Sequence, residues 1–222
     1  MPTPEQVQAA DAVLQEYNDR IDEAYGLHLD AAAAMPRWAD YFLESQRLSL
    51  RQLAHTPNGP KTIEDLDAIG FHYGEGDANT SAAVVLHQCT QGELKVRNQK
   101  GGANERASSR ALFTTIYQFW EDHYRQEFAR SLGLAKNGIT SDFFGDIRLI
   151  RNGIIHHRNK ATDDVKKCKL LKLFSPDQEI YLSDDQTKFV IRKLREALNE
   201  TLRANDNETL SPREFSLEGA EG

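Results

Sequence analysis

The chain has 222 residues, 39% of them hydrophobic, and a formal net charge of −7 at neutral pH. This length can bury the core of one large domain or two small ones, and the apolar fraction is ordinary for a globular protein. We see no stretch close to the roughly 20 apolar residues that cross a bilayer, so we expect no membrane segment. The negative charge argues against nucleic-acid binding over the whole surface.

The two cysteines, Cys89 and Cys168, cannot form a disulfide framework, and neither has the CxxC spacing of a metal site. The first residues, Met1 to Glu5, have neither the basic flank nor the apolar stretch of a secretory signal. We therefore expect a cytoplasmic protein with reduced thiols.

The first 60 residues predict two helices. Apolar residues at helical spacing run from Pro4 to about Tyr25, and Gly26 is a typical helix stop. A second helical stretch is predicted from about Leu29 to Leu53, with Pro36 either kinking it or starting its main part. The segment 56–60 then breaks the pattern.

Residues 61–102 predict shorter elements. A short helix is expected around Ile63 to Ile69, and 82–88 fits either a strand or a helix. The alternation of Leu94 and Val96 favours a strand over 93–97. Residues 99–102 read as a loop without a Walker-type or dinucleotide-type glycine pattern, so they are given no phosphate-binding role.

Helices return from Asn104. A broad apolar stripe continues for about six turns and ends near Gly133. Ser141 can cap a further helix that has Asp142 in its first turn and reaches about His157.

The last part of the chain predicts a small hairpin of 170–174 and 179–182. A capping box at 183–186 then starts a final helix. From Asn205 the chain is polar and patternless, which predicts a disordered tail.

The helix from Asp142 to about His157 has two different faces when each residue is rotated by about 100°. The buried face is predicted to contain Ile147, Ile150 and Ile154. The opposite side carries a polar stripe with one apolar residue inside it. Arg151 lies at the border between the buried face and this stripe, whereas His157 lies along the other flank of the buried face. This stripe consists of Arg148, Asn152, Ile155 and His156. An apolar side chain within a polar stripe suggests contact with another helix, and a two-fold axis there would gather two Arg and two His around one cleft.

The segment from Arg148 to Lys172 contains eight Lys or Arg and two Asp, so its charge is +6 in an otherwise acidic chain. Such a patch can attract a polyanion to one place, although a solvated basic loop is the alternative interpretation.

The run Arg151-Asn152-Gly153-Ile154-Ile155-His156, on a predicted helix with helices before and after it, resembles the motif of HEPN domains. The preceding residues 145–150 and the aromatic helix 117–125 also resemble bacterial members, and the resemblance covers about Asn104 to Asn205. It implies a mainly α fold, namely an antiparallel HEPN-like helical bundle at 104–205. Residues 1–103 would be an N-terminal helical extension with a small β element and no assigned function, and 206–222 a disordered tail.

The resemblance also implies a dimeric, metal-independent endoribonuclease without cofactors, of a kind common among bacterial toxins and anti-phage defence systems. His156 would exchange protons with the ribose 2′-OH and the 5′-oxygen, and Arg151 would hold the scissile phosphate. Asn152 would orient either the histidine or the phosphate. RNA binding is further expected from four residues around the motif, namely Arg148, His157, Arg158 and Lys160. Expected partners are RNA, a second copy of the chain and an antitoxin or other defence-system protein.

Two further interpretations of the sequence can be considered, and only the first remains open. One is a non-catalytic module that binds nucleotides or proteins and dimerises through the same helix, and the acidic net charge favours it mildly. The other concerns Asp142 and Asp146, whose spacing of four residues suggests a metal site. Carboxylates in a first helical turn are common without metal and no third ligand is suitably spaced, so no metal is expected.

Overall fold

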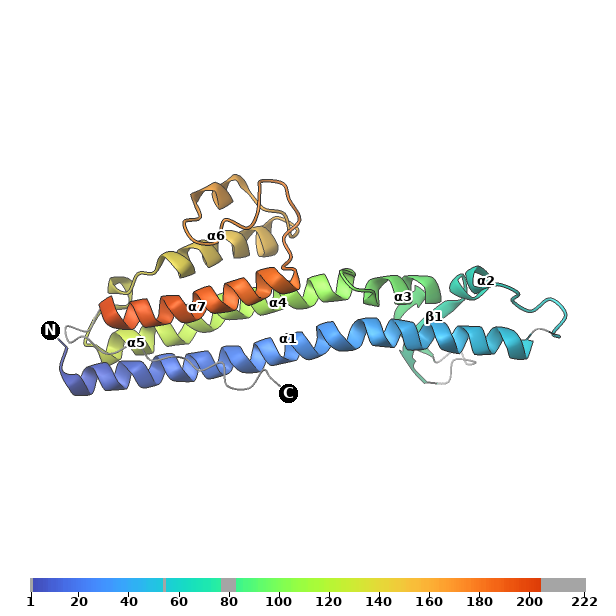
Figure 1. Ribbon diagram of the computed structural model, residues 1–222, viewed down its shortest axis with the longest axis horizontal. Helices are drawn as coiled ribbons and strands as arrows, with labels where there is room; N and C mark the ends of the chain where they lie inside the picture. Colours follow the sequence, from blue (N-terminus) through green and yellow to red (C-terminus); the bar gives the residue numbers. More distant parts are fainter. Residues whose placement is uncertain (1, 54, 77–82, 205–222) are drawn as a thin grey trace. The chain divides into compact units, whose positions relative to one another are not determined.

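The computed structural model describes residues 2–53, 55–76 and 83–204, and it is mainly helical with a small two-stranded antiparallel sheet (Figure 1). The mainly α fold class with a small β element, expected from the sequence, is confirmed. The tail predicted from Asn205 onward lies outside the described residues. The helices are α1 (Pro4–Leu53), α2 (Ile63–Asp67), α3 (Gln91–Asn98), α4 (Ala103–Phe119), α5 (Arg125–Ser131), α6 (Asp142–His156) and α7 (Asp184–Ala204). The strands are β1 (Gly70–Glu75) and β2 (Val84–Thr90).

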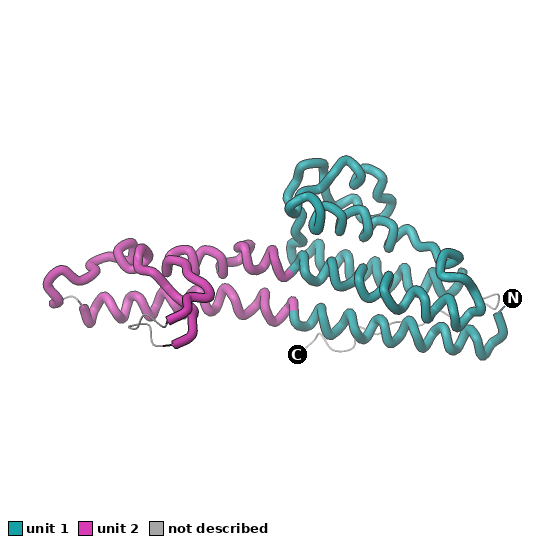
Figure 2. Tube along the Cα trace, turned by 180° about the vertical axis from the view of Figure 1, so that it is seen from behind, with its two compact units in different colours: residues 1–27, 109–222 teal, residues 28–108 magenta. Residues whose placement is uncertain are grey.

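The chain divides into two compact units, which we call unit 1 and unit 2 (Figure 2). Unit 1 contains residues 1–27 and 109–222, and unit 2 contains residues 28–108. The sequence suggested a boundary near residue 103, with residues 1–103 forming a region separate from the helical bundle. The first part of α1 instead belongs to the same unit as α5, α6 and α7.

Helix α1 is continuous from Pro4 to Leu53, so the predicted stop at Gly26 and the separate second helix are wrong. Glycine costs a helix only about 1 kcal/mol, and contacts on both sides of Gly26 offset this cost. Before it, Tyr17 and Ile21 are fully buried in the core of unit 1. After it, His28 Nδ1 lies 3.0 Å from Ser108 Oγ inside unit 2.

The two short helices of unit 2, α2 and α3, begin with capping boxes. Thr62 caps α2, which confirms the predicted short helix. The alternative left open at 82–88 is resolved for residues 84–88, which belong to strand β2 and pair antiparallel with β1, whereas residue 82 lies outside the described residues. The predicted strand at 93–97 is wrong, because this segment belongs to α3. Thr90 and Glu93 cap each other's backbone N–H groups there, and this local signal outweighs the apolar alternation.

The core of unit 1 is built around aromatic side chains. The Tyr17 hydroxyl donates a hydrogen bond of 2.8 Å to the backbone oxygen of Ile116. The Trp120 ring stacks on Phe144 with 4.1 Å between centroids, which joins the aromatic helix to α6. The predicted helix from Asn104 is interrupted by one π-helical turn, Trp120–Tyr124, between α4 and α5, and the chain leaves it near Gly133 as expected.

The hairpin predicted at 170–182 is wrong, since this segment forms no strand ladder within the described residues. A single bridge pairs Lys160 with Glu179 instead. The reason is a side chain of α6: buried Asp146 binds the backbone N–H groups of residues 169–171, so they cannot serve a ladder. The capping box at 183–186 is confirmed, and α7 follows it.

Candidate functional site

Helix α6 begins after Ser141, which occupies the predicted N-cap position but makes no side-chain cap bond. Ile147 and Ile150 are fully buried, and Ile154 packs against the core from a half-buried position. The predicted buried face is therefore confirmed. The opposite face is open: Arg148 and His156 are exposed, and 48% of Ile155 is accessible to solvent.

Arg151 leans on an aromatic ring of α4. Its Cζ lies 5.7 Å from the centroid of the Tyr117 ring, within the range of a cation–π contact. The buried Nε of Arg151 has no hydrogen-bond partner among the described residues. Because the side chain is oriented by a ring and not by a carboxylate, its positive charge is not neutralised by an acidic partner in the described part of the chain.

Tyr117 lies at the centre of a cluster of charged side chains. Burial raises the pKa of its hydroxyl, and the charge of Glu121 raises it further. The charges of Arg148, Arg151 and Arg125 act in the opposite direction but do not cancel this rise. Three guanidinium groups from α5 and α6 thus act on one phenol ring.

A cavity of about 320 Å³ opens beside Tyr117, at the start of α6. Its wall includes Glu121, Arg125 and Arg148. Glu121 forms ion pairs of 3.0 Å with Arg125 and 2.9 Å with Lys136. Although burial opposes ionisation of Glu121, these two cations hold its pKa below the ordinary value. Glu121 thus pairs with both Arg125 and Lys136, whereas Arg148, which is exposed at this cavity, forms no ion pair within the described residues.

Asn152 and His156 do not face Arg151. His156 follows Arg151 by five residues, which corresponds to about 140° around a helix. Asn152 is half-buried and His156 exposed, and neither side chain forms a hydrogen bond with the described residues. One chain thus gathers Arg148 and Arg151 beside Tyr117, whereas it points His156 in another direction.

The chain reverses sharply after α6. Arg158 and Asn159 have positive φ angles of 54° and 64°, a conformation that costs most residues about 1–2 kcal/mol. The returning chain passes so close to Gly153 that a Cβ there would lie 2.5 Å from the backbone oxygen of Lys160. The glycine inside the motif is therefore required by packing.

The other predicted RNA-binding residues lie in this reversal. His157, Arg158 and Lys160 are all exposed. A hydrogen bond from Lys167 is the main cause of the lowered pKa of Asp164, and the charge of His157 contributes to a smaller extent. His157 is thus close to a carboxylate and apart from the cluster at Tyr117.

Part of the basic segment is neutralised locally. Lys166 pairs with Asp163, Lys167 with Asp164, and Lys169 with Asp142. The other five cations form no ion pair within the described residues, and they are Arg148, Arg151, Arg158, Lys160 and Lys172. The basic surface is therefore narrower than the sequence count suggests, and most of it lies on α6 and the reversal after it.

The two acids considered as metal ligands have other partners. The buried Asp146 carboxylate accepts hydrogen bonds of 2.6–3.0 Å from the N–H groups of Lys169, Leu170 and Leu171. Asp142 pairs with the Lys169 ammonium at 2.6 Å. Within the described ranges, no group of three His, Cys, Asp or Glu side chains is arranged to hold a metal ion.

Sequence reasoning missed Tyr117 and the cavity beside it. The available signal was the four-residue spacing of Tyr117, Glu121 and Arg125, which places them along one face of a helix. It did not reveal that this face is turned toward α6.

Comparisons of the chain with family models, curated proteins and solved structures found no match. None of the helices in the described ranges has the length and apolarity needed to cross a membrane.

Proposed function

We propose that the protein is a metal-independent endoribonuclease that cleaves RNA at a composite site formed by two copies of α6. The observation that supports this most is the position of Arg151, held over Tyr117 without a neutralising acid in the described residues and bordering the stripe of Arg148, Asn152, Ile155 and His156. A guanidinium without an acidic partner is suited to bind phosphate.

The reaction would be an internal transesterification. The ribose 2′-oxygen attacks phosphorus and loses its proton to one His156, forming the P–O2′ bond. The P–O5′ bond breaks, and the leaving 5′-oxygen receives a proton from a second histidine. Arg151 stabilises the negative charge that develops on the phosphoryl oxygens. The products are a 2′,3′-cyclic phosphate and a 5′-OH end, so DNA, which lacks the nucleophile, is not a substrate.

A second copy supplies what one chain lacks. Arg151 and His156 point about 140° apart on one helix, so a single copy does not direct both at the same phosphate. Two α6 helices related by a two-fold axis would bring the arginine of one copy toward the histidine of the other. The exposed Ile155 is the apolar side chain around which these helices would pack.

The primary test is cleavage of a mixed RNA substrate, including tRNA, in excess EDTA by wild type, Arg151→Ala and His156→Ala. Matched controls are Arg192→Ala and His55→Ala, which remove the same residue types from exposed positions outside α6. We expect cleavage with cyclic phosphate ends by wild type and by both controls. Each motif variant should lose at least about 100-fold in rate, in line with the loss of a general acid–base or a charge-stabilising group.

Cleavage that persists in both motif variants would come from another site or a contaminant, and it would reject the proposal. No cleavage by purified wild-type dimer, after removal of any co-purified protein, would favour the non-catalytic binding and dimerisation module. A role in a toxin or defence system is part of the proposal and has its own test. Expression should arrest growth of the host cell, and His156→Ala should relieve the arrest.

A further inference from the structure

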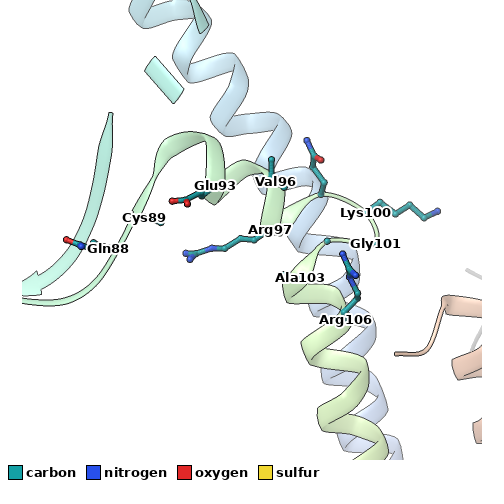
Figure 3. Close-up of a pocket in the computed structure, with 11 residues that line it drawn as sticks. Gln88, Cys89, Glu93, Val96, Arg97, Lys100, Gly101, Ala103 and Arg106 are labelled. Atoms are coloured by element: carbon teal, nitrogen blue, oxygen red, sulfur yellow. The ribbon is translucent and has the colours of Figure 1, made fainter. Parts of the chain in front are cut away.

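Unit 2 contains a larger cavity that the ribonuclease proposal does not use. It has a volume of about 700 Å³ and lies among the end of β2, the second half of α3, the loop 99–102 and the first turn of α4 (Figure 3). This volume is within the roughly 300–1,000 Å³ of sites for small organic molecules. It can hold more than an inorganic ion.

The wall of this cavity is basic although the chain as a whole is acidic. Arg97, Lys100 and Arg106 line it together with one acid, Glu93, so the charge of the lining is three minus one, or +2. The Glu93 carboxylate is already engaged, since it accepts a 2.7 Å hydrogen bond from the N–H of Thr90 at the cap of α3. Within the described residues, neither Arg97 nor Lys100 forms an ion pair with Glu93 or with another acid.

Arg97 has no acidic partner within the described residues. Its Nη1 lies 2.6 Å from His87 Nε2, and its buried Nε has no hydrogen-bond partner among them. In Figure 3, Arg97 extends from α3 toward the end of β2, across the space beside Cys89. Elsewhere in unit 2, by contrast, Lys95 pairs with Asp67 at 2.7 Å. A partly buried arginine beside an imidazole is an arrangement that an anion would stabilise.

The loop 99–102 between α3 and α4 contributes Gln99 and Lys100 to the wall, and its two glycines add no side chain to the space. Gly101 has a φ of +71°, and a Cβ on Gly102 would lie 2.6 Å from the backbone oxygen of Arg97. The loop thus passes directly against α3, and the first amides of α4, which have no partner inside the helix, follow it. These amides add to the positive potential of Arg97 and Lys100.

We propose that this cavity binds a small phosphate ester of about the size of a nucleotide. A single guanidinium donates two parallel N–H groups to phosphate oxygens, and Arg97 has no acidic partner within the described residues that would compete for them. Val96 and Ala103, which also line the cavity, offer an apolar surface to the rest of the ligand. The site belongs to a different unit from α6 and does not depend on ribonuclease activity.

Calorimetric titration of the full-length protein in EDTA tests this assignment, with ATP, adenosine and inorganic phosphate as separate probes. We expect ATP to bind at one site per chain, phosphate to compete with it weakly, and adenosine alone not to bind. Lys100→Ala and Arg97→Gln should each weaken ATP binding by about tenfold or more, as expected for loss of a charge-assisted contact. Arg37→Gln removes an exposed cation of the same unit and should leave the affinity unchanged.

Thermal unfolding of each variant shows whether it is folded, and the exposed Lys100 gives a change that does not disturb packing. Equal ATP affinity in wild type, Lys100→Ala and folded Arg97→Gln would overturn the proposal. Absence of binding by both ATP and phosphate would also overturn it, as would binding of a short RNA oligonucleotide alone.

Discussion

The buried carboxylate of Asp146 attaches the chain after α6 to the helix, and its replacement by asparagine is the most informative stability test. Only 2% of Asp146 is exposed, and its oxygens accept the backbone N–H groups of Lys169, Leu170 and Leu171. Asparagine keeps the shape but offers one acceptor oxygen. The side-chain NH2 of asparagine is itself a donor, so it cannot accept the backbone N–H groups that the second carboxylate oxygen accepts.

The magnitude follows from the three amides. A hydrogen bond to a charged group contributes about 1.5–3 kcal/mol, and a buried donor without a partner costs about 1–3 kcal/mol. The Leu171 amide belongs to a fully buried residue, whereas Lys169 and Leu170 are exposed and their amides can bind water. We therefore expect Asp146→Asn to lower the free energy of unfolding by about 2–4 kcal/mol, and the Tm by roughly 5–15 °C.

Urea unfolding followed by circular dichroism measures this loss, and Asp142→Asn is the control on the same helix. Asp142 contributes one exposed ion pair to Lys169, so its replacement should cost less than about 1 kcal/mol. A loss below about 1 kcal/mol for Asp146→Asn, or one equal to that of the control, would refute the reasoning.

Four further outcomes are expected. Gly153→Ala should destabilise the protein by about 1–3 kcal/mol in urea unfolding, despite the helix propensity of alanine, because the new methyl would overlap a backbone oxygen; an unchanged midpoint would contradict this. Burial raises the pKa of the Cys168 thiol to about 11, and a nearby carboxylate adds a smaller effect. A thiol reagent at pH 8 should therefore modify only Cys89 in the folded protein. Rapid reaction of both thiols would contradict this prediction. The pKa of Glu121 is lower in the folded protein than its ordinary value near 4.5, so the stabilisation by the ionised carboxylate is complete above pH 4.5 and is lost as the pH falls through the folded-state pKa. The difference in unfolding free energy between wild type and Glu121→Gln should therefore shrink from pH 6 to pH 3. A difference that stays constant over this range would contradict the argument. Arg158→Gly should be more stable than Arg158→Ala by about 1 kcal/mol, since only glycine adopts a positive φ without strain, and equal Tm values would show that the turn is unstrained.

Local sequence signals predicted the fold where they agreed with the tertiary contacts. The period of the apolar residues in α6 gave its bounds and its buried face, because the packing follows the same period. At Gly26 the local signal was a stop, but residues on both sides of it are buried and the helix is continuous. At 93–97 two local signals competed, and the capping box at Thr90 determined the structure.

The candidate site was only partly predictable for a different reason. The motif residues were found from the sequence, as was the border position of Arg151. The ring that orients Arg151 comes from α4, 34 residues earlier in the chain, and no local pattern connects the two helices. The attachment of residues 169–171 to Asp146 was equally non-local, and it is why a plausible hairpin did not form.

The six-residue motif contains two kinds of positions, and the difference bears on function. Gly153 and Ile154 are explained by folding, since one permits a close approach of the chain and the other packs on the core. Asn152, Ile155 and His156 are not: none of them is buried, and the two polar side chains form no hydrogen bond with the described residues. An exposed isoleucine between an asparagine and a histidine contributes little to the stability of a single chain. Under the proposed function these residues act through what α6 contacts, so substitutions confined to this face should alter assembly or RNA cleavage while leaving unfolding nearly unchanged.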